Sequence, residues 1–262
     1  MGVEPVSLGR LAASYGLLLI SLAILLYHRV PMMGETLAAI VRMTVQLLFV
    51  GLYLQVIFDL DHPGLNALWV LVMITVADVT ILRSCRLKLR FFGLPVFLAL
   101  LAGTAVPALA FLALILRRPH VLEAQYVVPI AGMILGNCLR ADIIGVRDFY
   151  QSLRKQEKTY LQSLAQGAVL REALRPFARE AVQAALKPTV STMATIGLVA
   201  LPGMMTGVIL GGNDPMTAIK YQIAIMIAIF TGTAITVFLA LRFTARTGFN
   251  EYGVLERDVF RS

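Results

Sequence analysis

The sequence predicts an all-α membrane protein, and three observations lead to this prediction. Hydrophobic residues make up 58% of the 262-residue chain, charged residues make up only 15%, and the mean hydropathy is +0.80. A soluble domain usually has about a quarter of its residues charged. The apolar residues also gather in runs of about 20, the length that crosses a hydrocarbon core as a helix. We therefore expect one transmembrane domain over residues 1–262.

Seven apolar runs are predicted to span the membrane. They cover residues 7–27, 36–58, 66–82, 91–116, 126–146, 189–211 and 217–241. The first run is long for the apolar region of a cleaved signal peptide, so it is interpreted as a span of the mature protein. The third run is short and the fifth ends among charged residues, so these two have the least sharply marked boundaries.

Basic residues orient the predicted helices, because Lys and Arg near span ends concentrate on the cytoplasmic side. An N-out, C-in arrangement places inside both the loop of about residues 148–187 and the cluster of Arg83, Arg86, Lys88 and Arg90. The net charge of +8 is thus mainly a topology signal. Its residues do not form the basic patch with interleaved aromatics that is typical of nucleic-acid binding, so nucleic acid is not an expected partner.

The loop of residues 148–187, between the fifth and sixth predicted spans, has the composition of a soluble segment. Apolar residues at roughly helical spacing alternate there with charged ones, which predicts helical structure at the membrane surface. Gly167 is predicted to break one helix and Pro176 to end the next, which isolates a short helix from Ala168 to about Arg175. Such a basic helix could dock into a partner or rest on anionic lipid, and spacing alone favours neither.

A glycine-rich stretch follows this loop. Gly203, Gly207 and Gly211 recur at intervals of four residues, directly after Pro202. On a helix they would lie close to one face, where missing side chains let another backbone approach closely. The pattern predicts either a close helix crossing within the bundle or a helix that lines a transport path, with the hydrogen-bond ladder interrupted at Pro202.

Ionisable and polar groups inside the predicted spans are candidates for a path or for bundle contacts, because they are costly at membrane depth. Arg42 and Gln46 are four residues apart and share a helix face. They could line a path, or Arg42 could pair with Asp78 in the third span. Arg140 and Asp142 extend the fifth span with charges, and the sequence leaves open whether they lie in the membrane.

Asn137, Met204 and Met205 are further candidates for the path or the bundle interior. A thioether is a soft ligand suited mainly to Cu(I), but methionine also fills irregular gaps in apolar cores. No metal ligand is therefore assigned. Cys85 and Cys138 are predicted near the cytoplasmic side, where disulfides are rare.

Several segments together resemble the FetB family of iron-export ABC permeases, to which plant permeases linked to aluminium tolerance are related. The resemblance covers about residues 36–241, and LPGMMTG is its most specific block. Gln166-Gly167-Ala168 followed by Arg171-Glu172-Ala173 is also similar to the coupling loop of ABC permeases. The other matching segments are VRMTVQLLFVG from Val41, VPIAGMILGN from Val128, KPTVSTMATIGLVALPGMMTG from Lys187 and DPMTAIKYQI from Asp214.

The resemblance implies a half-transporter of the inner membrane, in which the permease forms a homodimer and pairs with two ATP-hydrolysing subunits. Gly167, Ala168, Arg171 and Glu172 would lie on the coupling helix, which transmits closure of the ATPases to the spans. The chain contains no G-x-x-x-x-G-K-[ST] loop. ATP and Mg are therefore expected in the partner subunit, and no cofactor is expected in this chain.

An ABC exporter of iron or a related metal or solute has two alternatives. A stand-alone secondary transporter, driven by an ion gradient through Arg42, Asp78 and Asp142, predicts an inverted internal repeat, and no convincing one is visible. An intramembrane enzyme needs a catalytic group of residues, but no HExxH, GxSxG or paired membrane aspartates at helical spacing occur. We therefore expect a permease without enzymatic activity of its own.

Overall fold

The computed structural model describes residues 7–60, 62–116, 123–250 and 252–256. Within these ranges the chain is helical and has no strand, which confirms the all-α prediction. The helices in chain order are α1 (Leu8–Tyr15), α2 (Leu18–Tyr27), α3 (Met33–Leu60), α4 (Pro63–Ser84), α5 (Leu89–Phe111) with a π-helical turn over Leu112–Leu116, α6 (Ala124–Lys155), α7 (Glu157–Ala165), α8 (Leu170–Thr195), α9 (Gly203–Leu210) and α10 (Pro215–Thr247).

Six segments of the described chain are long and apolar enough to cross a membrane. They coincide with six of the seven predicted spans, but residues 189–211 do not form one continuous helix. α8 ends at Thr195, Gly197 adopts a φ of +86°, and Pro202 is the N-cap of α9. The predicted span is thus interrupted before Gly203, as Pro202 led us to expect, but the first helix already ends at Thr195, ahead of the proline.

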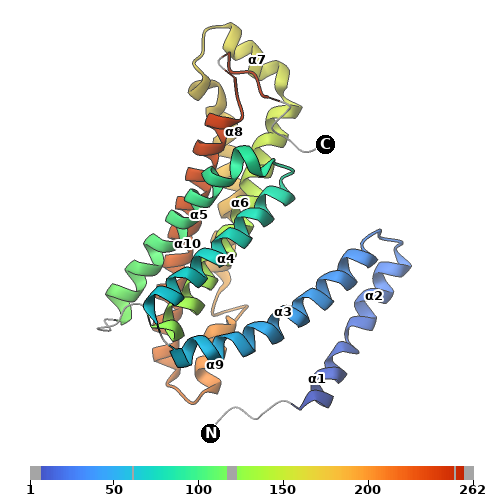
Figure 1. Cartoon of the computed structure of the whole chain (residues 1–262). Helices are drawn as coiled ribbons and strands as arrows, with labels where there is room; N and C mark the ends of the chain where they lie inside the picture. The colour runs from blue at the N-terminus through green and yellow to red at the C-terminus, as the bar shows by residue number, and fades with distance from the viewer. Residues whose placement is uncertain (1–6, 61, 117–122, 251, 257–262) are drawn as a thin grey trace.

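α8 and α9 nevertheless carry the chain from one end of the molecule to the other (Figure 1). α8 starts beside α7, whereas α9 lies at the opposite end, where α10 begins. The chain thus passes between the two ends of the molecule as two helices joined by a turn. The N-out, C-in orientation stays a prediction.

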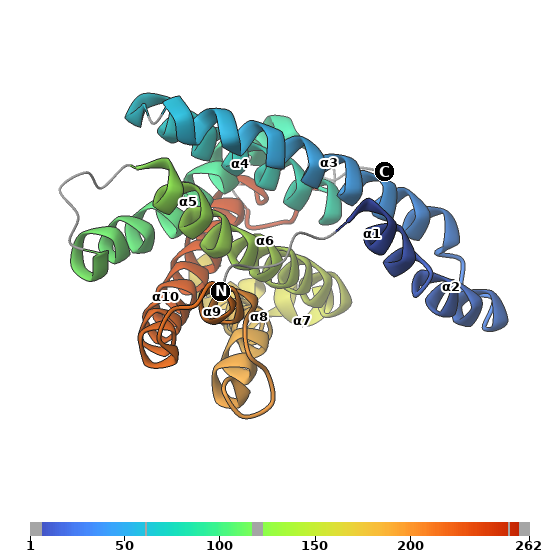
Figure 2. The same ribbon diagram turned by 90° about the horizontal axis from the view of Figure 1, so that it is seen from below.

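Two regions of the molecule differ in how they pack (Figures 1 and 2). The bundle consists of α4, α5, α6, α8 and α10. α6 contacts each of the other four helices, and α10 also contacts α5 and α8. Its fully buried side chains include Ile74, Phe92, Ile134 and Ile225. The arm, residues 8–60, comprises α1, α2 and α3 and leads away from the bundle, and α3 buries only Ile57.

α5 and α10 cross in close contact at two glycines. A Cβ atom added to Gly232 would lie 2.5 Å from the carbonyl oxygen of Gly103, so neither position has room for a side chain. By contrast, a Cβ on Gly203 or Gly207 would meet nothing within 4 Å, and one on Gly211 would meet only its own turn and Asn213. In the described residues no other helix approaches these three glycines closely, so a helix crossing at them stays a prediction.

Candidate coupling and transport sites

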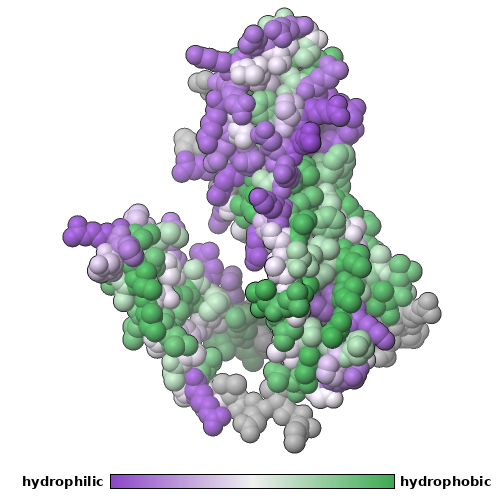
Figure 3. Space-filling model, turned by 180° about the vertical axis from the view of Figure 1, so that it is seen from behind, coloured by the Kyte–Doolittle hydropathy of each residue, from purple (hydrophilic) through white to green (hydrophobic). Residues whose placement is uncertain are grey.

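The residues predicted to couple to an ATPase lie at the corner between α7 and α8, at the hydrophilic end of the molecule (Figures 1 and 3). Gly167 closes α7 with a φ of +95°. Its N–H donates to the carbonyl of Leu164 (2.9 Å), and the N–H of Ala168 donates to the carbonyl of Ser163 (3.1 Å). This helix end needs a left-handed residue, which glycine adopts at no steric cost. Gly167 therefore shapes the corner.

α8 begins directly after the corner. The Glu172 carboxylate accepts a hydrogen bond from the N–H of Val169 (3.3 Å), and so satisfies a donor that the helix leaves open. Gly167, Arg171 and Glu172 are exposed, and Ala168 is half-buried. Arg171 thus presents its guanidinium to any docking partner, whereas Glu172 also holds the helix start.

The predicted short helix ending at Pro176 is wrong. α8 continues for 26 residues and contains both Pro176 and Pro188. Each proline removes one intrahelical hydrogen bond, but α8 packs along α6 and buries Leu174 and Phe177 next to the first of them. Tertiary packing therefore overrides the breaking tendency of proline. As a result, the corner belongs to a long helix that runs on towards the apolar part of the molecule.

Tyr160 fixes the corner to the C-terminal segment. Its ring lies 6.2 Å from the ring of Phe177 and 6.0 Å from that of Phe249, measured between centroids. Its hydroxyl donates a hydrogen bond to the carbonyl of Gly253. Burial raises the pKa of Tyr160 to about 12, so the hydroxyl keeps its proton at neutral pH. α7, α8 and the segment after α10 are thus tied together.

The residues predicted to line a path do not come together in one site. Arg42 and Gln46 are exposed on α3, in the arm, whereas Asp78 is buried in α4. α3 meets α4 at Tyr53 and Trp69, whose ring centroids lie 4.2 Å apart, and leads away from there. In the described residues no ion pair joins Arg42 to Asp78, so the predicted pairing is not formed.

Asn137, Met204 and Met205 also occupy separate places. Asn137 and Arg140 line a small pocket of about 40 Å³ between α6 and α8, and the Asn137 side chain donates to the carbonyl of Met133 (2.8 Å). Met205 is buried on α9 and Met204 packs partly against the core. No group of three or more His, Cys, Asp or Glu side chains that could hold a metal ion occurs in the described ranges.

Sequence reasoning missed a buried polar contact between α6 and α10. The Thr236 hydroxyl donates to Oδ2 of Asp142 (2.7 Å), and both side chains are fully buried. The other oxygen, Oδ1, has no hydrogen-bond partner in the described part of the chain, and the same holds for Oδ1 of Asp78. An open carboxylate oxygen in a bundle can accept a proton or contact a cation. A signal was available, because Thr236 follows Gly232 by four residues and shares its face of α10.

Comparison with known proteins adds a family. Residues 8–249 match the uncharacterised protein family UPF0014. The chain is 32% identical over 237 residues to the UPF0014 membrane protein slr1647 of Synechocystis, which covers 90% of this chain and 92% of that protein. It is 31% identical over 236 residues to the probable iron export permease protein FetB of Escherichia coli, with 89% and 90% covered. It is 31% identical over 221 residues to the protein ALUMINUM SENSITIVE 3 of Arabidopsis thaliana, with 83% and 79% covered. No solved structure matches the chain.

Proposed function

The chain belongs to the uncharacterised protein family UPF0014, and from this membership we propose that it is the permease subunit of an ABC transporter in the cell inner membrane. It is a multi-pass membrane protein. Because the similar protein of Escherichia coli is named a probable iron export permease, we propose that the cargo is iron or a related metal or solute, moved outward.

The observation that carries this proposal is the exposed corner between α7 and α8. An ABC permease without a phosphate-binding loop must receive energy through a surface that docks an ATPase. The corner offers exposed Arg171 at the hydrophilic end of the molecule, on a long helix that packs along α6. Movement imposed at Arg171 would therefore reach the apolar part of the bundle as a rigid-body shift of α8.

The proposed assembly contains two permeases and two ATPase subunits, with ATP and Mg bound by the ATPases. The arm supports a second copy of the chain. α3 exposes Arg42 and Gln46 within a candidate span, and polar side chains at such depth are costly when they face lipid. A second permease packed against the arm would give these side chains a protein environment.

Purification of the tagged chain from its native membrane in mild detergent tests the proposal. We expect a phosphate-loop ATPase in stoichiometric amount, identified by mass spectrometry, together with ATP hydrolysis that a transported metal stimulates. A chain that purifies alone even after cross-linking in the membrane, and that moves solute when an ion gradient is imposed on vesicles, would instead establish the gradient-driven transporter.

A charge reversal at the corner tests the docking surface itself. Arg171→Glu is expected to abolish co-purification of the ATPase and transport while leaving membrane insertion intact. Arg179→Glu is the matched control, because Arg179 is also exposed but lies about two turns further along α8. Glu172 is left unchanged, since its loss would also remove the hydrogen bond to Val169. Equal effects of the two reversals would contradict docking at the corner.

A further inference from the structure

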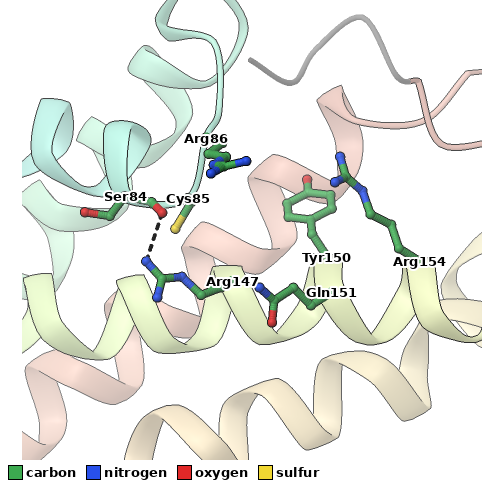
Figure 4. A pocket seen from close by; sticks show the side chains of 7 residues that line it. All are labelled: Ser84, Cys85, Arg86, Arg147, Tyr150, Gln151 and Arg154. Carbon is green, nitrogen blue, oxygen red and sulfur yellow. Dashed lines mark hydrogen bonds between the residues drawn. The ribbon is translucent and has the colours of Figure 1, made fainter. Parts of the chain in front are cut away.

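A second candidate site lies apart from the corner, where the turn between α4 and α5 meets α6 (Figure 4). The pocket there has a volume of about 620 Å³. Ser84 and Cys85 at the end of α4 form one wall with Arg86, and α6 forms the other with Arg147, Tyr150 and Arg154. In the described part of the chain this lining contains three arginines and no carboxylate.

Arg86 occupies a backbone position that normally belongs to glycine. Its φ is +56°, and the hydrogen bonds from Arg86 N–H to Arg83 O (3.2 Å) and from Leu87 N–H to Leu82 O (2.8 Å) close α4 in a Schellman motif. Glycine is the usual residue at this position of the motif, because a side chain is strained there. A strained residue at a pocket suggests that its side chain has a role. Here that side chain is an exposed guanidinium beside the pocket.

Arg147 is positioned from the opposite wall. One of its guanidinium nitrogens donates to the carbonyl of Ser84 (2.9 Å), which fixes the side chain across the end of α4. A guanidinium has five N–H donors, so this bond leaves others for a ligand. Arg154 follows Arg147 by seven residues and therefore lies on the same face of α6. The two walls thus direct positive charge at one space.

The remaining lining groups are neutral. Burial raises the pKa of the Cys85 thiol to about 12, so the sulfur is not a thiolate at neutral pH and does not offset the arginines. The Tyr150 hydroxyl donates to the carbonyl of Thr244 (3.1 Å). The pocket therefore suits an anion with several acceptor oxygens and does not suit a metal cation.

The pocket also lies at a defined depth. α4 and α5 are candidate spans, and the turn that joins them marks the end of their apolar segments. At this depth a basic pocket meets lipid headgroups. We propose that Arg86 and Arg147 bind a phosphate group here, carried by an anionic lipid or by a soluble phosphate. Arginine suits this role because its planar donors match phosphate oxygens bidentately. The proposal does not depend on the transport function.

The test compares lipid retention by wild-type protein and two variants. Arg86→Gly removes the charge but suits the left-handed backbone, so the variant is expected to fold at least as well as wild type. Arg83→Gln removes an exposed charge from the same helix end without touching the pocket lining. Each is extracted into nanodiscs of phosphatidylglycerol and phosphatidylcholine, and retained lipid is counted by native mass spectrometry. We expect Arg86→Gly to lower the retention of phosphatidylglycerol by about fivefold, and Arg83→Gln to change it little.

A second arm separates the two sources of phosphate. Inorganic phosphate is titrated onto each protein in phosphatidylcholine nanodiscs while the melting temperature is recorded, with chloride at equal ionic strength as the control. Stabilisation of wild type but not of Arg86→Gly would identify a soluble phosphate, whereas a difference confined to phosphatidylglycerol would identify the lipid. If Arg86→Gly and Arg83→Gln behave alike in both arms, the site is only general surface charge and the proposal is overturned.

Discussion

The arm and the bundle have similar hydropathy but very different burial. The candidate span in α3 has a mean hydropathy of 1.9, and none of its most apolar stretch is buried. The span in α6 has a lower value of 1.6, yet half of the corresponding stretch is buried. Apolar character therefore predicts which segments enter a membrane, but it does not predict which of them pack against one another.

The bundle and the arm differ in how closely other helices approach their glycines. Lipid tails are as apolar as leucine side chains, so membrane helices associate where small residues permit close packing. Gly103 and Gly232 bring α5 and α10 into contact, and a Cβ on Gly145 would lie 3.2 Å from both Ala185 and Val237. In the arm, a Cβ on Gly34 or Gly51 would meet nothing within 4 Å. Glycine thus packs helices only where the facing helix is already close.

The largest effect is expected from one added methyl group at the crossing. In Gly232→Ala the new Cβ would overlap the backbone carbonyl of Gly103, which cannot yield cheaply, and would lie 2.8 Å from Cγ2 of Ile134. We expect a destabilisation of about 1–3 kcal/mol or more, seen as a lower melting temperature in detergent. Gly51→Ala in the arm is the matched control and should melt at or slightly above the temperature of wild type, because its Cβ meets nothing and alanine is the better helix former. If both variants melt alike, the contrast between arm and bundle is false.

A smaller effect is expected from the buried hydrogen bond. Thr236→Val keeps the shape of the side chain but leaves the Asp142 carboxylate without its donor. The cost of leaving a buried acceptor unsatisfied is about 1–3 kcal/mol. Thr231→Val on the same helix provides the control, because the exposed Thr231 hydroxyl only donates to the carbonyl of Ile227 in its own turn. Equal melting temperatures for the two variants would show that the Asp142 contact contributes nothing.

The sequence predicted what depends on local pattern and missed what depends on packing partners. Six of the seven predicted spans coincide with helices of the structure because a run of apolar residues is enough to define each one, and Gly167 was predicted to break a helix because glycine tolerates its φ. Pro176 was misinterpreted because the packing of α8 along α6 and of Phe177 against Tyr160 is a tertiary effect. The pairing of Arg42 with Asp78 failed for a related reason. Spacing along two spans cannot show that α3 leads away from the bundle.

A substitution in the arm tests whether α3 faces lipid or protein. Gln46 is exposed on α3 and makes no described contact with the bundle. Gln46→Leu should therefore change the free energy of unfolding of the bundle by no more than about 0.5 kcal/mol. With a second permease on this face, as proposed, the dimer should dissociate a few-fold more readily, because interhelical polar contacts contribute about 0.6 kcal/mol. Light scattering coupled to size exclusion measures this dissociation. An unchanged dimer would place Gln46 against lipid.

The smallest expected effect concerns the first turn of α10, which is capped by the charged side chain of Asp214. By contrast, Leu17 at the N-cap of α2 in the arm provides no side-chain cap. The Asp214 carboxylate accepts hydrogen bonds from the N–H (2.9 Å) and the hydroxyl (3.1 Å) of Thr217, and these bonds lower the pKa of Asp214 below its ordinary value of 3.8. A carboxylate whose pKa is lowered in the folded state stabilises the fold at a pH above its ordinary pKa, and this stabilisation is lost as the pH falls through the lowered pKa.

The variant Asp214→Asn keeps an acceptor but does not titrate. The two proteins should therefore melt alike at neutral pH, and wild type should lose stability relative to the variant only below about pH 4. A difference that persists unchanged from pH 7 to pH 3 would show that the cap acts without its charge.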